Sequence, residues 1–157
     1  MVKAYLRYDL EQTLGVIATL NHACPILYAL DPERPDLAGS LVLSPALNQV
    51  SIWNIRTDSP AASLPPGRAA VSAMAQTKDG RRIAVGYANG EVGLYRKALG
   101  AEAWEQEFLE AGHTTAVRSL AFNSEGTVFA SGGDDTEIIL WDSVANVGLC
   151  RLRGHKD

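Results

Sequence analysis

A repeat of about 46 residues is the feature that most constrains how this chain can fold. Residues 113–141 align without a gap on residues 67–95, and glycines coincide at Gly86 and Gly132. A further strand-like run, QVSIWNI at residues 49–55, carries the aromatic Trp53 near its end. A fixed period of this length is typical of tandem arrays of small structural units. We place the three units at residues 1–66, 67–112 and 113–157.

Each unit is predicted to consist of four short antiparallel strands. Apolar or alternating runs of strand length are separated by acidic-glycine turns such as Asp79-Gly80. Asn89-Gly90 predicts a type I′ hairpin, because both residues tolerate positive φ. Residues 98–111 are interpreted as a loop and an outer strand rather than a helix, because of their place in the repeat. Four strands per unit at this period predict an all-β fold built from propeller blades.

The third unit carries a motif at each end. It begins at Gly112-His113 and ends at Trp141-Asp142, and a second Gly-His pair follows at residues 154–155. The spacing of these dipeptides resembles the WD-repeat family. The resemblance implies a WD-repeat β-propeller, represented here by about three blades of an incomplete ring.

Candidate site residues follow from this resemblance. In WD-repeat families a histidine, a hydroxyl residue, an aspartate and the tryptophan form a structural hydrogen-bond chain, and the matching residues are His113, Ser131, Asp135 and Trp141. The chemistry fits, because indole only donates, a hydroxyl relays, imidazole does both and carboxylate accepts. A metal site or a catalytic carboxylate pair at Asp134 and Asp135 is the alternative. Neighbours on an extended segment point to opposite faces, which favours a structural role.

The other two units depart from the motif. The second unit has different side chains at the four positions, namely Gly67, Val85, Asn89 and Tyr95. The first unit keeps Trp53, but the alignment puts Leu43 at the serine position and Leu47 at the aspartate position. We therefore expect these two blades to lack the polar chain and to rely on apolar packing.

Composition argues against several functional classes. The formal net charge of −4 argues against a segment whose main task is to grip phosphate. Cys24 and Cys150 are predicted to be buried reduced thiols rather than a disulfide. The sequence contains no signal-peptide pattern and no apolar run of membrane-spanning length, which predicts a soluble intracellular protein.

The evidence for catalysis in the sequence is slight. His22 and Cys24 could be a nucleophile pair, but they lie two residues apart and are better explained as neighbours on a strand. A glycine-rich phosphate loop is absent from the sequence, and two distant cysteines do not suggest zinc. We predict no enzymatic activity, no cofactor, no metal and no small-molecule substrate.

The N-terminal part carries a second resemblance. Residues 1–19 and 41–56, with Val-Lys-x-Tyr-x-Arg-Tyr at the start, resemble one WD-repeat family. It is the family of the twelfth U-three small nucleolar RNA-associated protein, a UTP-B subunit of the small-subunit processome. Members of that family are longer, and three blades cannot close a ring of about seven, so we expect a fragment of a longer protein.

This resemblance implies a function and a set of partners. It implies a non-catalytic scaffold in small-subunit ribosome biogenesis and pre-rRNA processing, located in the nucleolus. The expected partners are other UTP-B proteins and, through the complex, pre-ribosomal RNA and the U-three small nucleolar ribonucleoprotein. A general WD-repeat adaptor in ubiquitin ligation or chromatin is the alternative. Tyr5 and Tyr8 are candidate partner contacts. Scattered basic residues are weaker candidates for RNA contact: Lys3, Arg7, Arg81, Arg82, Arg118, Arg151 and Arg153.

Overall fold

Three four-stranded antiparallel sheets make up the computed structural model, which describes residues 24, 26–101 and 103–154. The first sheet contains β1 (Leu27–Ala29), β2 (Leu41–Ala46), β3 (Gln49–Asn54) and β4 (Ser59–Ser63). The second contains β5 (Val71–Gln76), β6 (Arg82–Tyr87), β7 (Glu91–Lys97) and β8 (Trp104–Ala111). The third contains β9 (Val117–Phe122), β10 (Val128–Gly133), β11 (Glu137–Asp142) and β12 (Val147–Arg153). Each sheet is a meander whose strands pair in chain order.

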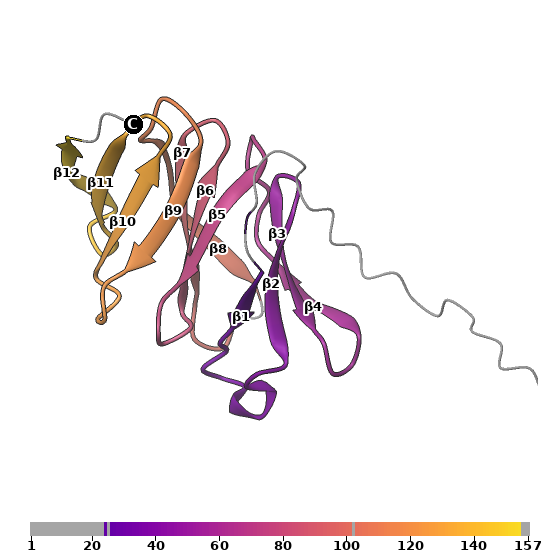
Figure 1. Ribbon diagram of the computed structural model, residues 1–157. Helices are drawn as coiled ribbons and strands as arrows, with labels where there is room; N and C mark the ends of the chain where they lie inside the picture. The colour runs from indigo at the N-terminus through magenta and orange to yellow at the C-terminus, as the bar shows by residue number, and fades with distance from the viewer. Residues whose placement is uncertain (1–23, 25, 102, 155–157) are drawn as a thin grey trace, which may run out of the picture.

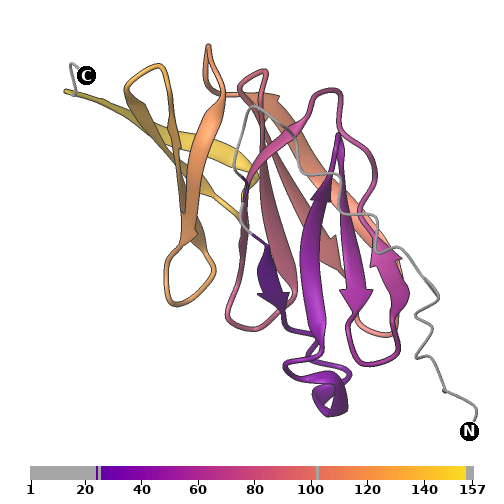
Figure 2. The same cartoon turned by 45° about the vertical axis from the view of Figure 1, so that its right-hand side comes forward.

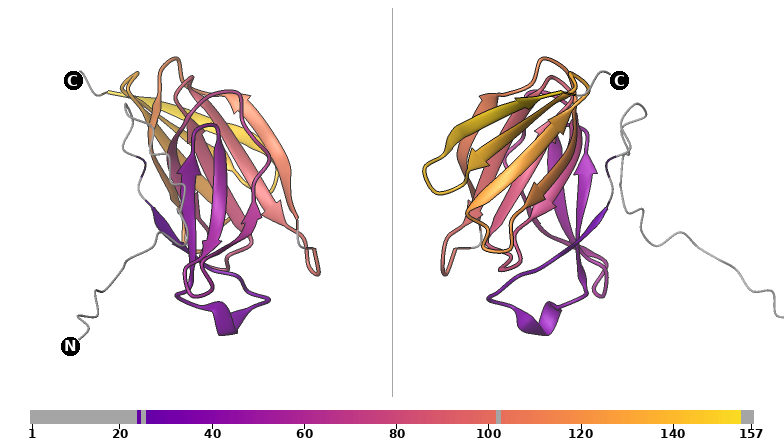
Figure 3. Two further views of the ribbon diagram at one scale, coloured as in Figure 1. Left: turned by 90° about the vertical axis from the view of Figure 1, so that its right-hand side faces the viewer. Right: turned by 60° about the vertical axis from the view of Figure 1, so that its left-hand side comes forward.

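The sheets stand side by side in chain order, like neighbouring blades of a propeller (Figure 1). Their strand directions rotate from one sheet to the next (Figure 2). The two views of Figure 3 bring the first sheet and then the third sheet to the front, so the second sheet lies between them. We call the sheets blades one, two and three. The all-β propeller architecture predicted from the repeat is therefore confirmed, whereas the exact blade boundaries stay a prediction.

Two hydrophobic cores lie between the blades. The core between blades one and two includes Leu43, Ile52, Val85 and Tyr95. The core between blades two and three is a separate set of apolar side chains: Ala73, Ala84, Val92, Leu94, Phe108, Val117, Phe129, Ile139 and Trp141. Successive side chains of a strand point to opposite faces, so β6 sends alternate residues into each core. Blade two is consequently buried on both faces, and β12 of blade three is exposed along its whole length.

A β-bulge at the same place in every blade shows which residues are equivalent. The pairing of the third strand with the fourth shifts just before Trp53, Tyr95 and Trp141. An extra residue in one strand re-aims the side chains beside it. The bulge therefore fixes these three aromatic residues as structural counterparts, independently of any sequence alignment.

The turn between β6 and β7 differs from the expected type. Gly90 has a φ of +88°, but Asn89 is not among the residues with positive φ, so the type I′ prediction is wrong. Instead Gly90 N donates to Tyr87 O at 3.1 Å, and the Asn89 side chain accepts from the backbone N–H of Glu91 at 3.2 Å. Asparagine caps the turn through its side chain and leaves the left-handed position to glycine.

The part of the chain with assigned structure contains one short 3-10 turn, η1 (Pro35–Leu37), and no helix long and apolar enough to cross a membrane. Trp104 opens β8, so the interpretation of residues 98–111 as a loop and an outer strand is correct. Tyr5, Tyr8, Lys3, Arg7 and His22 lie outside the described residues.

Candidate functional site

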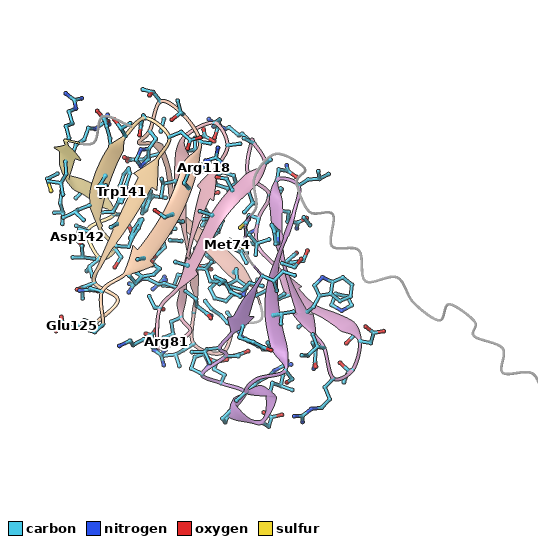
Figure 4. All side chains as sticks on the ribbon, viewed as in Figure 1. Met74, Arg81, Arg118, Glu125, Trp141 and Asp142 are labelled. Atoms are coloured by element: carbon cyan, nitrogen blue, oxygen red, sulfur yellow. The ribbon has the colours of Figure 1, made fainter. Side chains whose placement is uncertain are left out.

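The four residues predicted to form a polar chain lie together at one end of blade three. Trp141 Nε1 lies 2.8 Å from Ser131 Oγ, and the same Oγ lies 2.7 Å from His113 Nε2. His113 Nδ1 lies 2.9 Å from one oxygen of Asp135 and 3.1 Å from the other. Trp141, whose position is labelled in Figure 4, comes from β11, Ser131 comes from β10, and the other two come from the adjoining loops. The side chains of His113 and Asp135 are 0% and 6% exposed.

Donor and acceptor chemistry gives this chain a direction. The indole N–H can only donate, so Ser131 Oγ accepts it and donates its own proton to His113 Nε2. His113 is then protonated on Nδ1 and donates to Asp135. The carboxylate also accepts the backbone N–H of Thr114 and of Glu137. Burial alone raises the pKa of Asp135, but these hydrogen bonds outweigh it and the pKa is lowered.

Trp141 connects the polar chain to the core between the blades. Its ring lies 5.7 Å from that of Phe108 in blade two and 6.0 Å from that of Phe129 in β10. Aromatic rings at such separations attract each other beyond the area they bury. A single indole therefore joins the polar chain at its N–H to the contact between blades two and three at its ring.

Gly133 gives the histidine the space it needs. A Cβ added at Gly133 would lie 2.6 Å from His113 Nδ1 and 2.7 Å from Asp135 Oδ1. Those separations are shorter than real side-chain contacts allow, so glycine is required while the imidazole occupies this place.

The two adjacent aspartates do not form a joint site. Asp135 is buried in the polar chain, whereas Asp134 pairs with Arg118 at 2.6 Å and 2.7 Å through two of its guanidinium nitrogens. Arg118 and Asp134 are 46% and 42% exposed. No group of three or more histidine, cysteine or acidic side chains in the described ranges is arranged to hold a metal ion.

Blade two occupies the corresponding place with two tyrosines. The Tyr87 hydroxyl lies 2.6 Å from the Tyr95 hydroxyl, and the two side chains are 1% and 0% exposed. Tyr95 is the counterpart of Trp141, and Tyr87 aligns with Gly133 at the 46-residue offset. Burial first, and then the hydrogen bond, raises the pKa of Tyr87. The expectation that blade two relies on apolar packing alone is wrong, because a buried polar pair replaces the four-residue chain.

Blades two and three each pair a glycine with a large ring, but the glycine and the ring occupy opposite positions in the two blades. Gly67 aligns with His113, and a Cβ added there would lie 2.2 Å from a ring carbon of Tyr87. In blade three the ring comes from the loop before the first strand and the glycine from β10, whereas in blade two the ring comes from β6 and the glycine from the loop. The sequence alignment carries a signal of this exchange, because Gly67 aligns with His113 and Tyr87 aligns with Gly133.

Blade one shows an error in the sequence alignment. In blade three, Ser131 pairs across the strands with Ile139, which lies two residues before Trp141. In blade one, the residue two before Trp53 is Ser51, and its cross-strand partner is Ser44. The serine position is therefore Ser44 and not Leu43, which lies in the core. The hairpin between β2 and β3 has only two loop residues, one fewer than in blade three, and this shifts the register by one residue.

Two buried polar atoms of blade one have no hydrogen-bond partner in the described part of the chain. Ser44 Oγ and Trp53 Nε1 are both buried, and neither has a hydrogen-bond partner among the described residues. Leu47 does lie in the turn where the aspartate was expected, but it is 52% exposed and has a φ of +56°. An unpaired buried polar group costs about 1–3 kcal/mol. Blade one thus retains the serine and the tryptophan of the motif without the hydrogen bond between them.

The remaining candidates have ordinary surroundings. Cys24 and Cys150 are not joined in a disulfide, and Cys24 is only partly buried while Cys150 is exposed, so the prediction that both are buried is wrong. Burial raises the pKa of Cys24 to about 11, which keeps it protonated at neutral pH. Three of the basic candidates pair with glutamates: Arg82 with Glu107, and Arg151 and Arg153 with Glu137.

Comparison with known proteins finds similarity to WD-repeat proteins. Residues 105–142 match the model of the WD40 family, described as WD domain, G-beta repeat. The chain is 32% identical over 93 residues to WD repeat-containing protein SL1-17 of Schistosoma mansoni, and 46% identical over 46 residues to a U5 small nuclear ribonucleoprotein 40 kDa protein of Dictyostelium discoideum. These alignments cover 59% and 29% of the chain. The part of the chain from β8 to the end of β11 therefore resembles one repeat of that family.

Solved structures share the fold. The structure of U3-55K and the crystal structure of the RRP9 WD40 repeats each superpose with a TM-score of 0.69 over 85% of the chain, at 21% identity. The chain spans 39% of each of those chains, and 29% and 13% of the two curated relatives. At this identity the likeness shows the propeller fold.

Proposed function

We propose that this chain acts as a non-catalytic scaffold in an RNA-processing complex. The observation that carries the proposal is the closed polar chain of blade three. His113, Ser131 and Asp135 are residue types that hydrolases use, yet their hydrogen-bonding groups are directed at one another and at Trp141. A nucleophile must be accessible to a substrate, whereas Ser131 is 0% exposed. These residues stabilise a blade that can present its loops to other proteins.

The particular complex is inferred from resemblance. The N-terminal segments resemble a UTP-B subunit, and a sequence relative is named as a U5 small nuclear ribonucleoprotein protein. We place the chain in the small-subunit processome of the nucleolus. Its partners there are UTP-B proteins and, through them, pre-ribosomal RNA and the U-three small nucleolar ribonucleoprotein. A WD-repeat adaptor in ubiquitin ligation or chromatin remains the second candidate, because the blade architecture serves either role.

Sedimentation of a cell extract tests this assignment. The tagged protein would be separated on a gradient, and the fractions probed for U-three small nucleolar RNA and pre-ribosomal RNA. The proposal predicts co-migration in a large particle, which is lost when residues 1–60 are removed. Migration in a small complex free of both RNAs would contradict the processome assignment and favour the adaptor.

A further inference from the structure

Several cavities meet at one end of blades one and two. A cavity of about 320 Å³ lies between the η1 segment of blade one and the start of the β7–β8 loop of blade two. Neighbouring hollows of about 490 Å³ and 280 Å³ share lining residues with it or with each other. Arg81, labelled in Figure 4, marks the β5–β6 turn at this end. We call the whole depression, lined by residues 29–38, 78–82 and 96–101 and floored by Leu41, Ile52 and Trp104, the lower groove.

The lower groove has an apolar floor. Leu41, Ile52 and Trp104 line its largest cavity and are 4%, 5% and 6% exposed. Leu30 and Leu99, at its rim, are 45% and 75% exposed. A cavity of this volume, near the lower limit of ligand pockets, has room for one apolar side chain of a partner.

The carboxylates of the groove are already engaged. Asp31 accepts Lys97 Nζ at 2.7 Å, and Glu33 accepts the backbone N–H of Gly100 at 2.7 Å. Asp79 accepts the Thr77 hydroxyl at 2.5 Å and the backbone N–H of Arg81 at 3.1 Å. Asp31, Glu33 and Asp79 therefore each accept a hydrogen bond within the protein.

Three cationic side chains of the groove form no ion pair with a described residue. Arg34, Lys78 and Arg81 line it and are exposed, and none of the three forms an ion pair with another described residue. The residues that line the four hollows include six cationic and three acidic side chains, so the charge offered to a partner is positive. This positive surface lies on a chain whose formal net charge is −4.

We propose that the lower groove binds an extended acidic peptide segment of a partner protein, which inserts one apolar side chain into the 320 Å³ cavity. The carboxylates of the segment pair with Arg34, Lys78 and Arg81 at the rim. Complementary charge sets the orientation and the rate of encounter, and the buried anchor supplies affinity.

A nucleic acid fits the groove less well. Binding to single-stranded RNA relies on exposed aromatic rings for stacking and on a continuous basic track. The aromatic side chain of the lining, Trp104, is 6% exposed and lies on the floor. A phosphate backbone also has no apolar group to fill the cavity.

A peptide-binding assay on the 157-residue chain tests the inference. The probe is a fluorescein-labelled decapeptide of alternating glutamate and serine with one central leucine, and binding is followed by fluorescence anisotropy at low salt. Reversing two cations of the rim together, Lys78→Glu with Arg81→Glu, is expected to weaken binding about tenfold or more. Replacing the central leucine by serine should weaken it as well. Arg34→Glu is a second, independent variant with the same expected direction.

The control is Arg56→Glu, which changes the net charge by the same amount per site at an exposed arginine outside the groove. It should leave binding unchanged, and circular dichroism should show every variant folded. No binding of the peptide, equal binding without the leucine, or equal loss in Arg56→Glu would overturn the inference. Tighter binding of a single-stranded RNA decamer that is lost in the same groove variants would overturn it in favour of a nucleic-acid surface.

The inference deepens the proposed scaffold function and rests on it, because it names a surface through which partners are held. The two tests fail separately. A negative peptide assay leaves the sedimentation result intact, and sedimentation in a small complex leaves the measured peptide affinity intact.

Discussion

In blade three the corner beside β10 is filled by the imidazole of His113, whereas in blade two the ring of Tyr87 fills the equivalent place. Each ring requires a glycine opposite: Gly133 in blade three and Gly67 in blade two. Each ring also forms a hydrogen bond within its own blade, at 2.7 Å to Ser131 Oγ and at 2.6 Å to the Tyr95 hydroxyl. In both blades, this corner is therefore filled by a large ring whose polar atom forms a hydrogen bond.

The comparison teaches that a degenerate repeat need not be a weaker one. Blade two has lost the histidine, serine, aspartate and tryptophan of the motif, but its tyrosine pair is as deeply buried as the chain it replaces. In blade one the loss is not compensated, because Ser44 Oγ and Trp53 Nε1 are buried and no described residue pairs with either of them. Sequence identity to the motif is therefore a poor guide to how well a blade is held.

The largest loss of stability is expected from removing the buried pair of Tyr87 and Tyr95 in blade two. Tyr87→Gly removes a buried ring and the partner of the Tyr95 hydroxyl, and should lower the free energy of unfolding by about 3–5 kcal/mol. Gly67→His alone should also destabilise, because the new side chain meets the Tyr87 ring. The double variant exchanges the ring as blade three does, and should recover about 1–3 kcal/mol relative to the sum of the single effects. Urea denaturation measures all three, and strictly additive effects would refute the equivalence of the two corners.

The next effect concerns the serine that relays the chain in blade three. Ser131→Ala leaves Trp141 Nε1 and His113 Nε2 without their partner and should cost about 3 kcal/mol. Ser72→Ala in blade two is a matched control. Ser72 is 4% exposed, and its hydroxyl makes one hydrogen bond, to Val117 O at 2.6 Å. The control should cost about 1 kcal/mol in the same denaturation experiment. Equal costs would mean that Ser131 is not a relay.

Acid should weaken blade three through Asp135. Its pKa is lower in the folded state than in the unfolded chain, because His113 and two backbone N–H groups bind the ionised form. The stabilisation is therefore complete above the unfolded pKa of about 3.9, and is lost as the pH falls through the folded value. Asp135→Asn should remove part of the fall in unfolding free energy between about pH 5 and pH 2. An unchanged acid dependence in this variant would contradict the assignment.

The smallest effect is expected at the turns. Leu47 in blade one and Thr136 in blade three have φ values of +56° and +63°, a region that costs a residue with a side chain about 1–2 kcal/mol. Leu47→Gly should stabilise the protein by about 1 kcal/mol, and Thr136→Gly should act in the same direction. Thermal denaturation would show the gain as a small rise in the midpoint. A lower midpoint for Leu47→Gly would show that its exposed side chain contributes more than the strain costs.

The repeat alone was sufficient to predict the three blades, because strand-length apolar runs and turn residues recur at a fixed spacing. The proximity of His113, Ser131, Asp135 and Trp141 was predicted from the resemblance to the WD-repeat family. The serine position of blade one was misplaced because a hairpin shortened by one residue changes strand register without changing the apolar pattern. Tyr87 was missed because its role depends on space vacated at Gly67, a residue 20 positions earlier in the chain that only the fold brings into contact.

The most direct test of the central claim is hydrogen exchange at the tryptophan indoles, followed by NMR on protein labelled with nitrogen-15 at tryptophan. Trp53 and Trp141 are structural counterparts, but of the two only Trp141 has an acceptor for its indole N–H among the residues that the structure describes. The account predicts slow exchange at Trp141, faster exchange at Trp53, and loss of the Trp141 protection in Ser131→Ala with Trp53 unaffected. Equal exchange at the two indoles, or slow exchange at Trp141 that persists in Ser131→Ala, would contradict the claim that the polar chain stabilises blade three.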